Sequence, residues 1–155
     1  MKPKIFLGTD HAGFELKEEV KKYLQSLGYK AEDKGAFRLD EDDDYPDFIS
    51  ATAEAVSENK ESKGIIFGAS GQGEAIAANK IKGIRAAVFS CDNLEIVKLS
   101  RTHNDANILS IGARFVSKET AIKAVELWLA TDFSGEIRHK RRLKKIADLE
   151  KKACK

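Results

Sequence analysis

Cysteine is scarce in this chain, which has Cys91 and Cys154 as its two thiols among 155 residues. Two cysteines are too few for a disulfide framework, and their spacing does not suit a metal site. We predict two reduced thiols, with Cys91 packing at the end of a strand and Cys154 without a role in the tail. Long apolar runs are also absent, and the start MKPKIFLG is too short an apolar stretch for a signal peptide. These absences favour a cytoplasmic protein without a membrane segment.

An excess of one charge sign is lacking as well, since 27 Lys and Arg residues face 25 Asp and Glu residues. No overall field therefore points to nucleic acid or to a membrane surface. Charge does gather locally, in an acidic run over 39–47 and a basic run over 137–145. The basic run has no interleaved aromatic residues, which disfavours nucleic-acid binding by the tail but leaves it as an alternative.

Short apolar runs alternate with segments of helical period, which is typical of repeated βα units. Strands are predicted over 4–8, 29–35, 64–68, 84–90 and 106–112, and a helix is predicted over roughly 13–27. Pro46 is expected to start a second helix, and Ser117 is expected to cap a later one. We expect one α/β domain over 1–155, a Rossmann-like three-layer fold with a five-stranded parallel sheet in the order 2-1-3-4-5. A charged helix over 137–152 has a narrow apolar stripe. It either docks on a partner subunit or stays solvated.

In that order, the first and third strands lie side by side at the point where ligands bind in such sheets. Asp10 and His11 follow the first strand, and Ser70 and Glu74 follow the third. An acid, an imidazole, a hydroxyl and a carboxylate would then meet beside a glycine-rich loop. The sequence therefore predicts an active site at this edge of the sheet.

The stretch GASGQGEAIAANK, residues 68–80, fits none of three familiar glycine motifs. The dinucleotide fingerprint fails at Ile76, the Walker A motif fails at Glu74, and the nucleophile elbow fails at Gln72. What remains is either a nest of backbone N–H groups around Ser70 or a tight strand-to-helix turn. A helix N-terminus attracts anions, yet Glu74 places a carboxylate there.

Further polar side chains lie later in the chain. His103 and Asn104 occupy a polar turn before the fifth strand, and Arg114 lies just past that strand. Arg138 and Arg142 are four residues apart, so both guanidinium groups would share one helix face and could clamp a phosphate. The alternatives are a surface histidine and a solvated basic helix.

Several stretches together resemble the ribose-5-phosphate isomerase B family, which also includes galactose-6-phosphate isomerase subunits. They are GTDHAGFELK, DYPDF, FGASGQGEAIAANKIKGIRAA, LSRTHNDANILSIGARFV and RHKRRLKKI. The resemblance implies interconversion of aldose and ketose phosphates through a cis-enediolate, with no metal and no organic cofactor. It also implies a homodimer, or a dimer of dimers, whose active sites lie between subunits.

The resemblance assigns roles to individual residues. His103 would protonate the ring oxygen, Asp10 would take the anomeric hydroxyl proton, and Ser70 would help to hold the enediolate oxygen. The remaining expected substrate contacts are the amides of Ala69, Ser70, Gly71, Gln72 and Gly73, the sugar contacts Asn104 and Tyr45, and the phosphate ligands His11, Arg114, Arg138 and Arg142. For Tyr45, a packing role is the alternative.

One position departs from many family members, which carry a cysteine base where this chain has Gly68. Another branch of the family carries a glutamate at the position of Glu74, so we expect Glu74 to be the base that takes the C2 proton. Its helix-terminal position is expected to favour the ionised form. His103 precedes the fifth strand, at the sheet edge opposite Asp10 and Glu74. We therefore expect His103 and Asn104 to enter the site of the partner subunit.

The substrate expected from the resemblance is D-ribose 5-phosphate, with D-ribulose 5-phosphate as product. A six-carbon sugar phosphate such as allose 6-phosphate or galactose 6-phosphate is the alternative, because one more carbon only lengthens the pocket. A non-catalytic sugar-phosphate-binding module is a further alternative. The carboxylate of Glu74 counts against it, because a protein that merely cradles phosphate gains nothing from a negative charge there.

Overall fold

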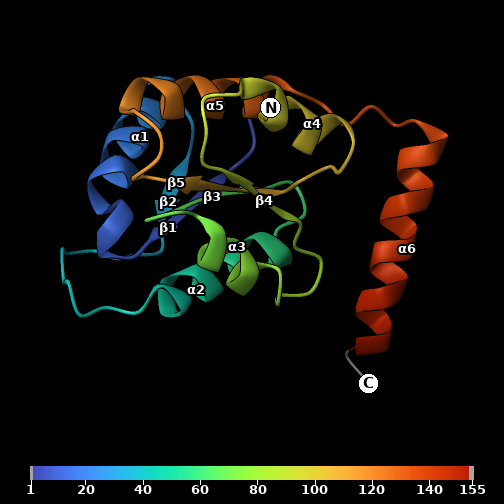
Figure 1. The fold of residues 1–155 in the computed structure, drawn as a ribbon, viewed down its shortest axis with the longest axis horizontal. Helices are drawn as coiled ribbons and strands as arrows, with labels where there is room; N and C mark the ends of the chain where they lie inside the picture. Colours follow the sequence, from blue (N-terminus) through green and yellow to red (C-terminus); the bar gives the residue numbers. More distant parts are fainter. Residues whose placement is uncertain (1, 154–155) are drawn as a thin grey trace.

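The computed structural model describes residues 2–153, which form a single α/β domain with a central parallel sheet and helices on both faces (Figure 1). The strands are β1 (Ile5–Thr9), β2 (Ala31–Asp33), β3 (Lys63–Gly68), β4 (Ala86–Phe89) and β5 (Ile108–Gly112). The helices are η1 (His11–Gly13), α1 (Phe14–Ser26), α2 (Tyr45–Glu58), α3 (Gln72–Ala78), α4 (Leu94–Thr102), α5 (Lys118–Ala130) and α6 (Ile137–Ala153). The predicted three-layer fold is confirmed.

The strand order is β2-β1-β3-β5-β4, so the predicted order is wrong at its last two positions. β5, not β4, pairs with β3, in a register that sets Gly112 beside Gly68. Every residue of β5 is buried, whereas three of the four residues of β4 are only partly buried. Burial explains the difference, because the strand that is buried along its whole length lies inside the sheet and the shorter, partly buried strand is left at its edge. The polar β2 forms the other edge, as predicted.

Two apolar clusters hold the layers together. The larger one joins the sheet to α1, α4 and α5, with Trp128 as its largest fully buried side chain, and the smaller one joins the sheet to α2 and α3. Cys91 packs partly buried against the larger cluster, as predicted. Cys154 lies outside the described residues.

Helix ends follow the capping signals in the sequence. The Ser117 hydroxyl accepts a bond from the Thr120 N–H at the start of α5, and Pro46 lies in the first turn of α2, as predicted. Where a helix was expected over 13–27, the structure has α1 over Phe14–Ser26, preceded by the short 3-10 turn η1. Between residues 2 and 153, no helix has both the length and the apolar character needed to cross a membrane.

α6 stands beside the domain, beyond the β4 edge and outside the two helical layers (Figure 1). His139 is its one buried residue, and its side chain meets the end of α4. Near the other end of α6, the Glu150 carboxylate accepts a hydrogen bond of 2.8 Å from the Gly83 N–H. Ile137, Ile146 and Leu149 are exposed, so much of the apolar surface of α6 has no cover within this chain.

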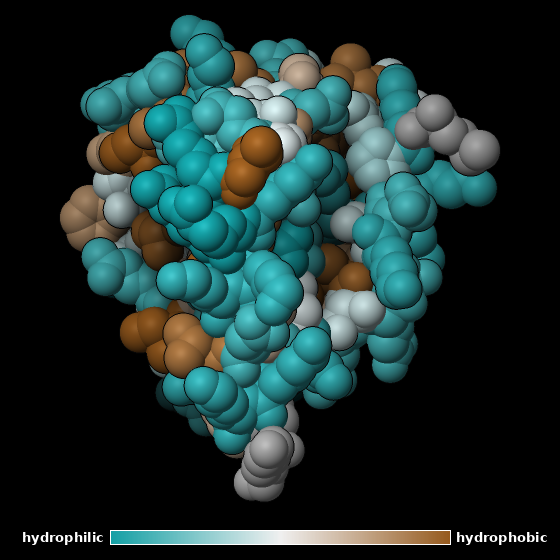
Figure 2. All heavy atoms as spheres, turned by 90° about the vertical axis from the view of Figure 1, so that its right-hand side faces the viewer, coloured by the Kyte–Doolittle hydropathy of each residue, from teal (hydrophilic) through white to brown (hydrophobic). Residues whose placement is uncertain are grey.

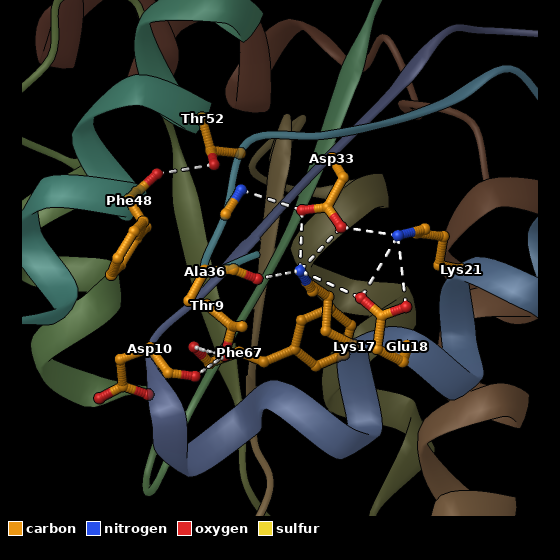
Figure 3. A network of polar contacts seen from close by, with 11 residues as sticks. Thr9, Asp10, Lys17, Glu18, Lys21, Asp33, Ala36, Phe48, Thr52 and Phe67 are labelled. Atoms are coloured by element: carbon orange, nitrogen blue, oxygen red, sulfur yellow. Dashed lines mark hydrogen bonds and ion pairs between the residues drawn. The ribbon is translucent and has the colours of Figure 1, made fainter. Parts of the chain in front are cut away.

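A buried ion network fixes the chain just after β2 (Figure 3). Lys17 of α1 is fully buried, and its Nζ lies 2.8 Å from both carboxylate oxygens of Asp33 and 2.6 Å from the Ala36 carbonyl oxygen. Lys21 also donates to Asp33, at 2.7 Å. Burial by itself would raise the pKa of Asp33, but the bonds from Lys17, Lys21 and the Gly35 N–H outweigh it and lower the pKa. The network anchors the start of the acidic loop that leads to α2.

Candidate active site

The carboxyl ends of β1 and β3 bring the first two candidate groups together. The register pairs Thr9 with Phe67, so Asp10 leaves β1 beside the point where Gly68 ends β3. The Thr9 hydroxyl reinforces this junction through hydrogen bonds to the carbonyl oxygens of Asp10 and Phe67 (Figure 3). Asp10 is 6% exposed, and its carboxylate accepts a bond of 3.0 Å from the Ala12 N–H. The structure thus holds this carboxylate in a fixed place at the predicted edge.

The glycine loop is rigidly shaped by its neighbours. Gly71 has a φ of 77°, which favours glycine, and precedes the first turn of α3. A Cβ there would lie 3.1 Å from the backbone of Ser110 and Gly112, and the Ser110 hydroxyl donates to the Gly71 carbonyl oxygen at 2.6 Å. The Ser70 hydroxyl accepts a bond of 3.3 Å from the Gln72 N–H. The tight strand-to-helix turn is therefore confirmed, while a nest of N–H groups that holds a substrate anion stays a prediction.

Glu74 is buried inside this loop, with 5% of its surface exposed. Its carboxylate occupies the space beside Gly68, where a Cβ atom would collide with it. Position 68 therefore cannot carry a side chain while Glu74 takes this conformation.

The pKa of Glu74 is raised, contrary to the expectation that its helix-terminal position favours the ionised form. Burial is the main cause, and the negative charge of Asp10 adds to it. The N–H groups of Glu74 and Gly71 donate to the carboxylate and lower the pKa, but by less. The loss of hydration outweighs the helix end. A raised pKa makes the carboxylate a stronger proton acceptor once it is ionised.

Tyr45, the first residue of α2, lies against the glycine loop. A Cβ on Gly73 would fall 2.8 Å from the Tyr45 hydroxyl oxygen. The ring is partly buried, between the acidic loop and α3. The structure therefore places Tyr45 beside the predicted site, where both a sugar contact and a packing role remain compatible with its position.

His11 is held by Asp43, a residue that the sequence analysis did not single out. Asp43 Oδ1 lies 2.7 Å from His11 Nδ1 and accepts a bond of 3.0 Å from the His11 N–H. The side-chain bond to Asp43 is the main cause that raises the pKa of His11, opposed by burial and by the charge of Arg114. The Arg114 N–H donates to the Ala69 carbonyl oxygen at 3.1 Å, which ties Arg114 to the same loop. His11 and Arg114 thus lie together on one side of the glycine loop.

Asp10, His11 and Asp43 are also the group, among residues 2–153, whose ligand atoms lie close enough for a metal ion, within 4.8 Å of one another. We interpret the trio as a hydrogen-bonded cluster, because the Nδ1 atom that would face an ion already bonds to Asp43.

The remaining candidates lie at the opposite edge of the sheet. His103 follows α4 and precedes β5, so it lies at the amino ends of the parallel strands, away from Asp10 and Glu74. Its ring contacts that of His139, with centroids 4.2 Å apart. The Ser134 hydroxyl lies 2.9 Å from His139 Nδ1, and burial lowers the pKa of His139. Within one chain, the structure does not bring His103 to the glycine loop.

Asn104, Arg138 and Arg142 lie on this side too. Arg138 and Arg142 are exposed on α6, where Arg138 pairs with Glu136 at 2.8 Å. Asn104 lines a groove between α6 and the β4 edge, together with Ile84, Ala86, Leu143 and Ile146. The α6 side of the molecule is mainly hydrophilic, with separate apolar patches (Figure 2).

Two residues at opposite edges of the sheet, Asp43 and His139, escaped the sequence analysis for the same reason. Asp43 stands in a run of acidic residues and His139 in a run of basic ones, so neither differs from its neighbours in the sequence. Their partners His11 and His103 are far away along the chain. The sequence offered one signal, which is that Asp43 lies two residues before the already noted Tyr45.

Comparison with known proteins relates this arrangement to one family. The family model for ribose/galactose isomerases matches residues 5–146. The chain is 40% identical over 148 residues to ribose-5-phosphate isomerase B of Mycolicibacterium paratuberculosis, covering 96% of this chain and 92% of that protein. It is also 40% identical over 149 residues to ribose-5-phosphate isomerase B of Escherichia coli, covering 96% of this chain and 97% of that protein.

Solved structures agree. Ribose-5-phosphate isomerase B of Clostridium thermocellum superimposes with a TM-score of 0.91 at 44% identity, over 97% of this chain and 99% of that one. The enzyme of Mycoplasma genitalium, solved with bound ribulose-5-phosphate, gives a TM-score of 0.92 at 37% identity, over 97% and 98% of the two chains. By sequence and by fold, the chain belongs to the ribose/galactose isomerase family.

Proposed function

We propose that this protein interconverts D-ribose 5-phosphate and D-ribulose 5-phosphate, with Glu74 as the base. The observation that carries the proposal is the buried Glu74 carboxylate, which fills the space beside Gly68 and accepts hydrogen bonds from the N–H groups of Gly71 and Glu74. Proton transfer between C2 and C1 of a sugar requires a base and an anion hole at the same point. The relative solved with bound ribulose-5-phosphate supports this substrate class.

In the proposed reaction, Asp10 binds the anomeric hydroxyl while the ring opens. Glu74 then takes the proton from C2, and the negative charge that develops on the substrate oxygen is stabilised by Ser70 and the N–H groups of 69–73. The proton is then returned to C1 while the hydroxyl proton on O2 passes to O1, which leaves the carbonyl at C2 and regenerates the carboxylate. His11 and Arg114 bind the phosphate from the same chain.

The ring-opening acid is proposed to come from a second copy of the chain. His103 and Asn104 lie at the wrong edge for their own Glu74, and Arg138 and Arg142 lie exposed on α6 nearby. The uncovered apolar side chains of α6, together with Ile76 on α3 at 63% exposure, support a contact with another subunit. A homodimer, or a dimer of dimers, would then combine Glu74 of one copy with His103 of the other.

The substrate is tested by a coupled assay that compares ribose 5-phosphate with allose 6-phosphate. We expect the higher kcat/KM with ribose 5-phosphate. A preference for allose 6-phosphate would replace the pentose with the six-carbon alternative. Saturable binding of both sugars without turnover of either would favour the non-catalytic module.

The shared site is tested by combining two inactive variants, Glu74→Gln and His103→Asn. Co-expressed with different affinity tags and purified on both, they form hybrid dimers in which one site has Glu74 from one chain and His103 from the other. We expect these hybrids to be active while each variant alone is inactive. Inactive hybrids, or a fully active monomer in gel filtration, would contradict the shared site.

A further inference from the structure

His11 is bound at two atoms by a single carboxylate oxygen. Asp43 Oδ1 accepts from the His11 backbone N–H at 3.0 Å and lies 2.7 Å from Nδ1. A carboxylate beside Nδ1 requires the proton on that nitrogen, which fixes the ring's orientation. No residue within 2–153 forms a hydrogen bond with the other ring nitrogen, Nε2. The ring is partly exposed, so Nε2 is the atom left for a ligand.

The surroundings of Asp43 indicate that it is matched to a positive charge. Its side chain is 9% exposed, and Oδ2 is buried with no hydrogen-bond partner in the described part of the chain. A buried carboxylate oxygen without a donor is costly unless a nearby cation compensates it. The ring of His11 contacts this carboxylate at Oδ1, so its protonated form would place a positive charge beside it.

Three charged groups face His11 from the elements packed around it. Asp10 at the end of β1 has an oxygen 4.0 Å from Nδ1, Asp43 precedes α2, and Arg114 follows β5. The two carboxylates favour the imidazolium and the guanidinium opposes it. Because the bond to Asp43 has the largest effect, the pKa of His11 lies above its ordinary value.

We propose that Asp43 is a positioning residue for phosphate recognition, which holds the His11 ring so that a protonated Nε2–H is presented to the substrate phosphate beside Arg114. The inference rests on the proposed function, since it assigns the phosphate of that substrate to this side of the site. Asp43 does not touch the substrate in this account. It acts through His11, by orientation and by charge.

The test is a series of three variants at one position. Asp43→Asn keeps an oxygen that can accept both bonds but removes the charge, Asp43→Ala removes both, and Asp43→Glu restores the charge. Asp42→Asn is the matched control, because Asp42 is exposed and its side chain has no hydrogen bond to His11. For Asp43→Asn we expect KM for ribose 5-phosphate to rise about tenfold or more, with kcat little changed. The reason is that the weakened contact to the phosphate is made equally in the ground state and in the transition state.

The pH dependence separates a charge effect from damage to the fold. A raised pKa means that His11 keeps its proton to higher pH, so phosphate binding weakens as pH rises through that pKa. Without the Asp43 charge, the weakening should begin at lower pH. The KM values of wild type and Asp43→Asn should therefore converge in acid, where both proteins carry the imidazolium, and differ near neutral pH.

A readout independent of activity is the NMR titration of His11 in the substrate-free protein, assigned among three histidines with His103→Asn and His139→Asn. We expect a lower His11 pKa in Asp43→Asn and Asp43→Ala than in wild type, and recovery in Asp43→Glu. An unchanged His11 titration, or a KM that rises equally at every pH, would overturn the proposal. Loss of the proposed function would look different, because wild type itself would then lack isomerase activity while the His11 titration still responded to Asp43.

Discussion

Replacing Glu74 with glutamine is expected to lower kcat about 100- to 10,000-fold, the usual contribution of a positioned general base. Glutamine has nearly the same shape and still fills the space beside Gly68, but it cannot take a proton. KM should change little, because the anion hole and the phosphate ligands remain. The measurement is steady-state kinetics with ribose 5-phosphate, and a variant within about tenfold of wild type would exclude Glu74 as the base.

The pH profile and two further variants make this prediction specific. The pKa of Glu74 is raised in the substrate-free protein, so kcat/KM should fall as acid protonates the base at a pH above the ordinary range for glutamate. Glu119→Gln is the matched control, since Glu119 lies in the first turn of α5 but is exposed. Gly68→Ala should also lower kcat because its Cβ displaces the Glu74 carboxylate. In the double variant, Gly68→Ala should lower kcat little further than Glu74→Gln does alone, because both changes act on the same carboxylate.

Replacing Lys17 with methionine is expected to lower the free energy of unfolding by about 3–5 kcal/mol, the cost of breaking a buried ion pair by removing one partner. Methionine fits the aliphatic part of the lysine but donates nothing to Asp33 or to the Ala36 carbonyl oxygen. Lys21 still reaches Asp33, but from a side chain that is 25% exposed. Chemical denaturation at neutral pH measures the loss, and a change below about 1 kcal/mol, the range of surface pairs, would contradict it.

Controls for Lys17 come from the same helix and from pH. Lys22→Met should be nearly neutral, because Lys22 is 70% exposed and pairs with Glu19 at 3.5 Å. The pKa of Asp33 is lowered in the folded state, so its ion pairing stabilises the fold fully above the ordinary aspartate pKa of about 4. That contribution is lost as pH falls through the lowered pKa. The difference between wild type and Lys17→Met should therefore shrink in acid.

Local patterns in the sequence predicted the units of the fold correctly. Alternating apolar runs and helical periods identified five strands, and Pro46 and Ser117 marked the starts of α2 and α5. Strand order failed at β4 and β5 because it depends on which strand is buried on both faces. The predicted order came from the commonest winding of such sheets, whereas here the burial of β5 prevailed.

The site shows the same division. Parallel topology was enough to predict that Asp10 and the glycine loop meet, because the ends of neighbouring strands share one edge. The prediction that Glu74 favours its ionised form was wrong, because the helix-end rule assumes access to water and this carboxylate is buried. The roles carried over by resemblance for His103, Arg138 and Arg142 stay predictions, because within one chain these residues lie away from Glu74.

By itself, then, the sequence determined the α/β class, the family signature and the residue types of the candidate site, since these depend on local periodicity and on short motifs. Only the tertiary structure decided which strand lies inside the sheet, that Glu74 occupies the space left by Gly68, and that Lys17 meets Asp33. It alone paired His11 with Asp43 and His103 with His139. The reason is physical: burial and the contact of side chains distant in sequence set charge states and orientations, and no local pattern records them.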